Sequence, residues 1–481
     1  MTYFSLPRIL LTGLPPQLRV LRRSSAPAPL PAPVPGGPRR GRSFLGDGFS
    51  ALRHRNYRLY LSGQIVSLIG TWMQSVSQPW LVLLLGGSAI QLGIVLALQF
   101  APPMVFAPLG GVLADRIDKR HALIGTQAAA MVEAGVLFAL TVTGVIEIWH
   151  IYVLATALGL INAVDMPVRQ AFAAELVPSD ELANAIALNS ATFNAARVVG
   201  PAVAGVTLAL FGPAVNFGIN AVSYLAVLGG LWMMIPAQMR RIERPESFGS
   251  VRSSIAEGVR YAVRTPMVLW PLILLGGVAM FGMNFQTLLP LYAKDVLSMG
   301  ADGYGALYAA MGVGSLAGSL MLAFSGNRRP LLRLIMGGAA AFVLFEVLLG
   351  VAPFPLAAFP TVVVLGFAAM LMVNTINVTV QNGVPDALRG RVMSLYVMVF
   401  AGSAPFGGLF AGAMAELFGA DIAFLIGALL AAVVVLLFAY QLLWGALSTK
   451  ASRRVIKAMT AAELARASRD EDDEQPHAIG A

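Results

Sequence analysis

Cysteine is absent from this chain of 481 residues, histidine occurs only four times, and just 12% of the residues are charged. Without thiols there are no disulfides, thiolate metal ligands or thiol nucleophiles. The cysteine content therefore does not indicate whether the protein works in an oxidising or a reducing compartment. His54, His121, His150 and His477 each lie near or beyond the end of an apolar run. The composition therefore predicts no metal site, no cofactor and no catalytic residue of these types.

Hydrophobic residues, in contrast, make up 57% of the chain, and the mean hydropathy is +0.74. These values are typical of membrane proteins. A bilayer core about 30 Å thick needs roughly 20 apolar residues per helix, and the chain supplies twelve such runs. We place the expected spans near 57–85, 90–113, 123–143, 149–172, 182–210, 214–235, 267–292, 303–324, 331–351, 357–380, 391–414 and 420–444.

The basic residues follow a clear pattern along the chain. All but three of the 33 Lys and Arg lie in the two tails and in alternate loops between the spans; the exceptions are Arg169, Arg197 and Lys294. The positive-inside rule then predicts a multi-pass protein of the cell membrane with both termini in the cytoplasm. Because the bases follow the loops and form no single patch, we expect the lipid bilayer, and no nucleic acid, as a partner.

The two sets of six spans show weak internal similarity. An offset of 212 residues brings Gln74 onto Gln286 and Gly93 onto Gly305. We therefore predict an all-α membrane protein with twelve transmembrane helices in two pseudo-symmetric six-helix bundles. The expected parts are a disordered, basic, Pro-rich cytoplasmic tail at 1–52, an N-terminal bundle at 53–236, a cytoplasmic linker at 237–265, a C-terminal bundle at 266–446 and a cytoplasmic tail at 447–481.

One short loop, GGVLADRIDKR at 110–120, concentrates charge between the second and third spans. It resembles the signature of the major facilitator superfamily, G-x-x-x-D-R-x-x-[RK]-R. The matching residues are Gly111, Asp115, Arg116, Lys119 and Arg120. The resemblance implies that the aspartate closes a cytoplasmic gate in the outward-open state. The alternative is a tight loop that only retains orientation.

The second-half copy of this loop, SGNRRP, has lost the acidic residue. A gate in that half is therefore expected to be weaker or to use other partners. The candidates are Asp386, Arg389 and Arg391 in VPDALRGR.

Two longer stretches indicate one branch of this superfamily. They are residues 165–205 and the segment RGRVMSLYVMVFAGSAPFGG at 389–408. They are similar to the branch of the major facilitator superfamily that contains the enterobactin exporter and macrolide or multidrug efflux proteins. This resemblance implies fold and branch. It does not specify the cargo, because that branch handles chemically varied molecules.

Ionisable groups inside the spans are costly, at least ~2.5 kcal/mol each, so each needs a partner or a wet cavity. The turn near Pro178 joins the fourth and fifth spans. At ~1.5 Å per residue, Asp165 and Arg197 each lie about 20 Å along their span from this turn, so we expect them at similar depth in the membrane. We hypothesise a pair between them, with Arg169 as the competing partner one turn from Asp165. The pair would act either as a structural clamp or as a protonatable switch.

Two acidic residues lie inside apolar spans, Glu133 in the third and Glu346 in the ninth. They occupy nearly equivalent positions in the two halves of the chain. The resemblance places these spans at the periphery of the fold, which disfavours a cavity role. A lone carboxylate facing lipid would be protonated. Glu133 is accordingly a candidate proton site.

The resemblance places spans 1, 4, 7 and 10 around a central cavity, and these spans carry amides and aromatics. Such side chains either bond neighbouring helices or face a wet pocket, and a pocket is favoured here. The candidates for cargo contact are Gln64, Trp72, Gln74, Gln78, Gln170, Asn284, Gln286, Asn374, Asn377 and Gln381. Gly200 and Pro201 of the fifth span are assigned to close packing or a bend.

The function predicted is secondary active transport by alternating access, with export of a bulky amphipathic small molecule, siderophore-like or drug-like, driven by protons. Export and the proton rest on the resemblance. No Walker loop is present, so ATP does not drive transport within this chain, and no supported enzyme site is found. We expect a monomer. The alternatives are an importer or facilitator of the same fold, or a transport-inactive membrane sensor.

Overall fold

The computed structural model describes residues 49–240, 251–325 and 331–444. Within these ranges, the side chains of residues 107–116, 251–255, 325 and 386–387 lie outside the description. Most of the two predicted tails is likewise outside it. The described residues form helices and no strand, which confirms the all-α prediction.

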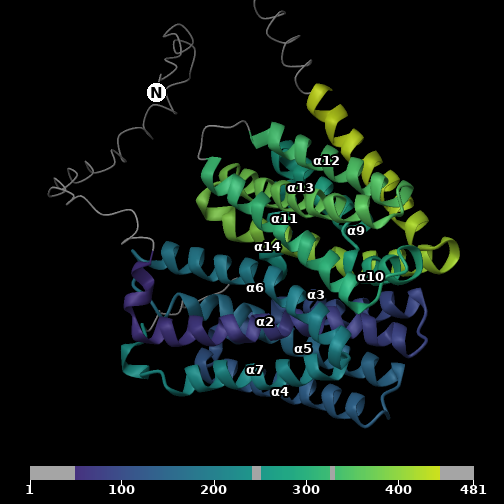
Figure 1. Cartoon of the computed structure of the whole chain (residues 1–481). Helices are drawn as coiled ribbons and strands as arrows, with labels where there is room; N and C mark the ends of the chain where they lie inside the picture. The colour runs from purple at the N-terminus through teal and green to yellow at the C-terminus, as the bar shows by residue number, and fades with distance from the viewer. Residues whose placement is uncertain (1–48, 241–250, 326–330, 445–481) are drawn as a thin grey trace, which may run out of the picture. The chain divides into compact units, whose positions relative to one another are not determined.

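The first bundle contains six helices packed against one another, drawn in purple to teal in Figure 1. They are α2 (Arg55–Leu84), α3 (Ala89–Arg116), α4 (Lys119–Val142), α5 (Ile148–Ala173), α6 (Leu182–Phe211) and α7 (Pro213–Trp232). The turn between α6 and α7 is a single residue, Gly212, with φ of 77°, followed by Pro213 at the start of α7. Glycine permits this backbone conformation, and proline is pre-organised for a first helical turn.

The second bundle repeats this organisation after a short linker. The linker contains η5 (Pro236–Gln238) and the helix α8 (Val251–Arg264). The bundle itself contains α9 (Pro266–Phe281), α10 (Phe285–Leu291), the π turn η6 (Tyr292–Val296), α11 (Ala301–Ser325), α12 (Leu331–Val351), α13 (Pro355–Asn382), α14 (Asp386–Phe418) and a last helix, Ala420–Trp444. Gly419, with φ of 90°, makes the turn that corresponds to Gly212.

Within the described residues, eleven helical segments are long and apolar enough to cross a membrane. Pro266–Val296, which combines α9, α10 and η6, counts as one of them. The remaining expected span is α2, whose 30 residues give a length of about 45 Å. It is more polar than the others because it buries amides and serines against its neighbours: Gln64, Ser67, Gln74, Ser77 and Gln78. A hydropathy criterion alone therefore does not identify α2 as a membrane span.

The two bundles meet along two pairs of helices, α3 with α14 and α6 with α11. We call the helix ends near α8 the linker end and the opposite ends the far end. Glycines bring the backbones into contact toward the far end: a Cβ added at Gly305 would lie 2.1 Å from the Cα of Gly205, and one at Gly93 would lie 2.4 Å from the carbonyl oxygen of Gly408. Such small residues permit close helix contact in membranes.

Side chains complete this contact at the far end. The rings of Trp80 and Tyr304 stack with centroids 5.5 Å apart. Lys294 donates to the carbonyl of Leu83 at 3.4 Å. The backbone N–H of Ile90 on α3 also donates to Glu416 of α14 at the far end, and Arg197 of α6 donates to Met370 of α13 at mid-depth. The structure is thus one in which the bundles are joined at the far end.

Candidate functional site

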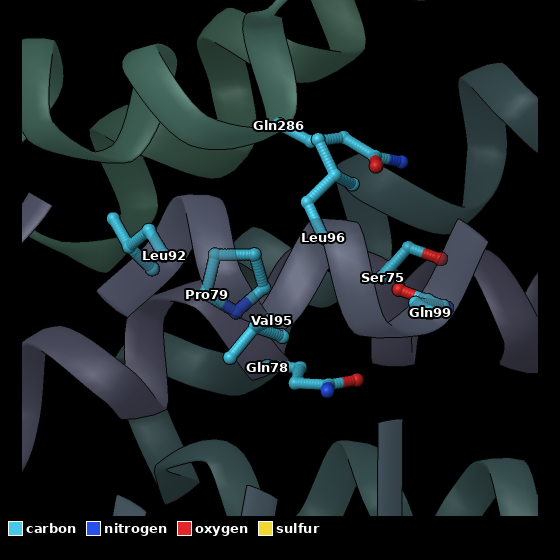
Figure 2. A pocket seen from close by; sticks show the side chains of 8 residues that line it. All are labelled: Ser75, Gln78, Pro79, Leu92, Val95, Leu96, Gln99 and Gln286. Atoms are coloured by element: carbon cyan, nitrogen blue, oxygen red, sulfur yellow. The ribbon is translucent and has the colours of Figure 1, made fainter. Parts of the chain in front are cut away.

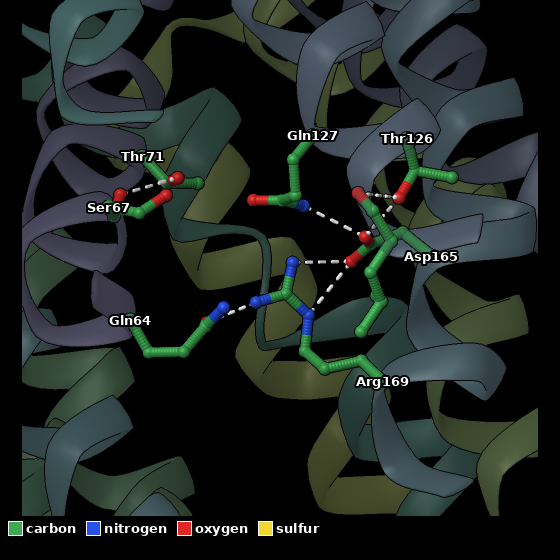
Figure 3. A network of polar contacts seen from close by, with 8 residues as sticks. Gln64, Ser67, Thr71, Thr126, Gln127, Asp165 and Arg169 are labelled. Atoms are coloured by element: carbon green, nitrogen blue, oxygen red, sulfur yellow. Dashed lines mark hydrogen bonds and ion pairs between the residues drawn. The ribbon is translucent and has the colours of Figure 1, made fainter. Parts of the chain in front are cut away.

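Asp165 is the centre of a buried polar network in the first bundle (Figure 3). Its Oδ1 accepts hydrogen bonds from Thr126 at 2.7 Å and from Gln127 at 2.8 Å, both on α4. Its Oδ2 accepts from Arg169 Nε at 2.8 Å and Nη2 at 2.6 Å. Arg169 also donates to Gln64 of α2. The network therefore ties α5 to both α4 and α2, and it satisfies both carboxylate oxygens.

The hypothesised pair of Asp165 with Arg197 is wrong. Arg197 donates to the sulfur of Met370 at 3.3 Å, and its guanidinium carbon lies 5.7 Å from the centre of the Trp72 ring. Asp165 instead pairs with Arg169, the competing partner, four residues along the same helix. Similar depth in the membrane did not mean that the side chains of Asp165 and Arg197 face each other, because depth does not fix the side of the helix on which a residue lies. The role of the Asp165–Arg169 pair as clamp or switch remains a prediction.

Arg197 lies at mid-depth between the bundles, in aromatic surroundings. Trp72 also contacts Phe193, with ring centroids 5.8 Å apart. The Arg197 Nε has no hydrogen-bond partner among the described residues. Its contact with Met370 of α13 joins α6 to the second bundle. The guanidinium group of Arg197 is thus placed against an aromatic ring and a sulfur atom.

Glu133 is buried inside the first bundle, away from any contact between the bundles. Gln74 donates to its two oxygens at 3.1 and 3.3 Å, and Asn220 of α7 donates to Gln74 at 2.6 Å. The assignment of Gln74 to the cavity is therefore wrong: this amide joins α2, α4 and α7. Sequence alone did not single out Asn220, although it is an amide in an apolar span like those that were.

Asn284 is also misassigned to the cavity. It is buried, and its Nδ2 donates to the carbonyl of Met280 at 2.8 Å. A Cβ added at Gly407 of α14 would lie 2.5 Å from the Asn284 side-chain oxygen. Asn284 thus packs between helices of the second bundle, at the break between α9 and α10.

Two predicted amides, Gln78 and Gln286, line a small pocket of about 20 Å³ where α2 and α3 of the first bundle meet α10 of the second (Figure 2). The residues that line it are Ser75, Gln78, Pro79, Leu92, Val95, Leu96, Gln99 and Gln286. The Nε2 of Gln78 has no hydrogen-bond partner among the described residues. Gln99 was missed by the sequence analysis because α3 was not among the spans expected to line a cavity.

The remaining predicted amides and small residues are dispersed. Asn374 donates to Ser319 at 3.1 Å, and Gln381 donates to Asn377 at 2.6 Å. Gln170 is exposed. Gly200 packs against Trp72, since a Cβ added there would lie 2.4 Å from that of Trp72. Pro201 is buried within an unbroken α6.

Several described basic residues at the linker end make contacts within their own half or with α8. Lys119 pairs with Glu175 at 2.5 Å, and Arg120 donates to the carbonyls of Leu231 and Trp232 at the end of α7. Arg391 pairs with Glu257 of α8, and Arg389 donates to the carbonyl of Gln381 at 3.3 Å. The side chains of the other predicted gate residues lie outside the described residues: Gly111, Asp115, Arg116 and Asp386.

A family model described as a transmembrane secretion effector, of the major facilitator superfamily, matches residues 46–469. The chain belongs to this family. The predicted superfamily and its fold are thereby confirmed, and the protein is a multi-pass membrane transporter.

Relatives of this transporter include carriers of siderophores. The staphyloferrin A transporter of Staphylococcus aureus (strain NCTC 8325 / PS 47) is 25% identical over 379 residues, covering 75% of this chain and 90% of the relative. The enterobactin exporter EntS of Escherichia coli O1:K1 / APEC is 24% identical over 346 residues, covering 71% and 81%. A solved structure of a variant of the nucleoside transporter NupG has a TM-score of 0.66 at 14% identity, covering 80% of this chain and 99% of that one. The structural likeness shows the fold.

Asp118 gives this transporter a titratable helix cap in the loop before α4. Its Oδ1 accepts the backbone N–H of His121 at 2.9 Å. Partial burial works to raise the pKa of Asp118, but hydrogen bonds from His121 and Arg120 and the nearby His121 ring outweigh it, so the pKa is lowered. The stabilisation is therefore complete above the unfolded pKa and is lost as the pH falls through the folded one.

Replacement of this cap tests that linkage. Asp118→Ala is expected to lower the free energy of unfolding by about 1 kcal/mol at neutral pH, and by less in acid, because the N-cap acceptor is lost. Asp118→Asn retains a capping oxygen and serves as the matched control. The measurement is thermal unfolding in detergent at neutral and acidic pH. Equal destabilisation by both substitutions at neutral pH would contradict the capping role.

Proposed function

We propose that this transporter exports a bulky amphipathic small molecule of the siderophore or drug class, in exchange for protons, by alternating access. The observation that carries the proposal is the set of amides and apolar side chains that both bundles contribute where they meet. In this state these side chains enclose only about 20 Å³, so cargo would be admitted only when the bundles part. Such a lining suits a cargo with rings and hydroxyl groups. The relatives that carry staphyloferrin A and enterobactin favour the same class.

The direction of the molecule in the membrane follows from its charge. The linker and both tails hold most of the Lys and Arg residues, so we assign the linker end and both termini to the cytoplasm. Contact of the bundles at the far end then corresponds to a state closed toward the outside. Cargo would enter from the cytoplasm, and parting of the far-end contacts would release it outside.

Transport into inverted membrane vesicles tests this proposal. Labelled iron-free enterobactin and staphyloferrin A are the probes. With an acidic vesicle interior, at least one probe is expected to accumulate against its gradient, and a protonophore should abolish the accumulation. Accumulation that ignores the pH gradient would exclude proton coupling. Uptake only in right-side-out vesicles would favour an importer, and no flux of either probe in either orientation would count against this cargo class.

The pocket makes a separate prediction about cargo affinity. The double variant Gln78→Ala with Gln286→Ala removes two amides, each able to contribute about 1 kcal/mol through hydrogen bonds. Binding of the transported probe should weaken roughly tenfold or more, as measured by titration of the purified transporter. Gln238→Ala, at an exposed position of η5, is the matched control. Unchanged affinity in the double variant would place the cargo elsewhere.

A further inference from the structure

Glu346 of α12 is a carboxyl group without a protein partner. It is 0% exposed, and neither of its oxygens has a hydrogen-bond partner among the described residues. Glycines and a phenyl ring surround it: a Cβ added at Gly282 would lie 2.8 Å from Oε2, and one at Gly427 would lie 3.6 Å from Oε1. The same Cβ at Gly282 would lie 2.6 Å from the ring of Phe342. An ionised carboxylate in such a place would carry a large desolvation cost.

The few basic groups on the elements packed around Glu346 stand elsewhere: Lys294 of η6 bonds the other bundle, and Arg333 lies at the start of α12. α9, α10 and α13 contain no ionisable side chain. Tyr292 of η6 donates its hydroxyl to the carbonyl of Leu349 at 2.7 Å. The other ionisable side chains on these elements stand toward their ends: Asp295 on η6, and Asp421 and Tyr440 on the last helix.

A metal cation does not fit this place either. Hard cations need several oxygen ligands, and the surroundings of Glu346 are phenyl rings and helix-packing glycines. Phe285 and Phe342 contact each other with centroids 6.1 Å apart. A single proton is the ligand that satisfies a carboxylate here without further donors. In this state Glu346 is therefore a neutral carboxylic acid.

The first bundle contains a hydrogen-bond partner of the kind that the Glu346 carboxyl group lacks. There Glu133 accepts two hydrogen bonds from Gln74 on the continuous helix α2. The internal repeat places Gln286 at the position of Gln74, and Glu346 lies one residue beyond the position that corresponds to Glu133. In the second bundle, however, the corresponding span is broken: α9 ends at Phe281 and α10 begins at Phe285. Gln286 lines the pocket between the bundles.

We propose that Glu346 is a proton-binding site whose ionisation is coupled to closure of the break between α9 and α10. In the broken state the carboxyl group holds its proton and Gln286 faces the pocket. In the continuous state Gln286 donates to the ionised carboxylate, as Gln74 does to Glu133. The O–H bond of the acid breaks on this change, and the proton passes to water that reaches the carboxyl group as the helix rearranges. The proposal rests on proton-coupled transport and assigns one of its proton sites.

Infrared spectroscopy of the full-length transporter in liposomes tests the protonation state. The wild type should show a carboxylic C=O band of a group without hydrogen bonds at neutral pH. Glu346→Gln, which keeps the shape of the side chain, should lack this band, whereas Glu133→Gln should retain it. A spectrum of Glu346→Gln identical to that of the wild type would overturn the proposal.

Spin-label distances at the linker end test the coupling. Because the chain has no cysteine, labels at Ala183→Cys and Gly390→Cys report on α6 and α14 alone. A change from mildly acidic to mildly alkaline pH should alter the ratio of the two distance populations by at least about threefold in the wild type. Glu346→Gln should abolish that response, and Gln286→Leu should abolish it while keeping the infrared band. A response of Glu346→Gln equal to that of the wild type would overturn the coupling.

These readouts use neither cargo nor flux. If the band and the distance response are found but the vesicles show no proton-driven transport, the proposed function fails and the site stands. If proton-driven transport is found without the band, the site fails and the function stands.

Discussion

Arg169→Met is expected to lower the free energy of unfolding of this transporter by about 3 kcal/mol. The substitution leaves the Asp165 carboxylate, whose side chain is only 5% exposed, without its counter-charge in the membrane interior. Removal of one partner of a buried ion pair costs about 3–5 kcal/mol. We expect the lower end because the Arg169 side chain retains 23% exposure. The measurement is denaturant unfolding in mixed micelles.

Two further variants separate charge from packing. Arg197→Met removes another arginine at mid-depth, but one whose described contacts are Met370 and Trp72 and include no acid. Its cost should be about 1 kcal/mol or less. Asp165→Asn combined with Arg169→Met should recover most of the stability lost in Arg169→Met, because no unpaired charge remains. If Arg169→Met and Arg197→Met cost the same, the ion pair is not what stabilises the network.

Gly305→Val is expected to reduce transport at least about tenfold while the protein still reaches the membrane. A Cβ at this position would lie 2.1 Å from the Cα of Gly205, so the backbones of α6 and α11 must separate where the bundles meet. Overpacking of a tight contact costs about 1–3 kcal/mol, and each 1.4 kcal/mol changes a population ratio tenfold. The readouts are vesicle flux and the spin-label distances at the linker end.

Gly337→Val is the matched control for this substitution. It introduces the same side chain into a helix of the second bundle, but nothing lies within 4 Å of a Cβ at Gly337. Transport by Gly337→Val should be close to that of the wild type. Equal loss in both variants would show that the closeness of α6 and α11 at the far end has no special part in the cycle.

The helical membrane fold could be read from the sequence because hydropathy and the loop charges act over long stretches, whereas the superfamily was predicted from the resemblance of the loop at 110–120 to its signature. A run of about 20 apolar residues specifies a span whatever its neighbours are. The exception, α2, shows the limit of that signal: Gln64, Gln74 and Gln78 lower its hydropathy because the helix is packed inside the protein.

The polar site was predicted less well, since position along a helix gives depth but not the direction in which a side chain points. Asp165 and Arg197 were placed at equal depth, yet Asp165 points to α4 and to Arg169. Gln74 and Gln286 occupy equivalent positions in the two halves, but one bonds Glu133 and the other lines the pocket. The difference arises from the break after Phe281, which neither composition nor periodicity indicates.

A reversible cross-link at the far end tests most directly whether the bundles must part there. A Cβ at Gly412 of α14 would lie 3.1 Å from the Cα of Ile90 on α3, so cysteines at Ile90→Cys and Gly412→Cys are close enough for a disulfide. Oxidation of this double variant should stop the vesicle accumulation that the same variant shows before oxidation, and reduction should restore it to that level. Full cross-linking with undiminished accumulation would contradict alternating access through the far end.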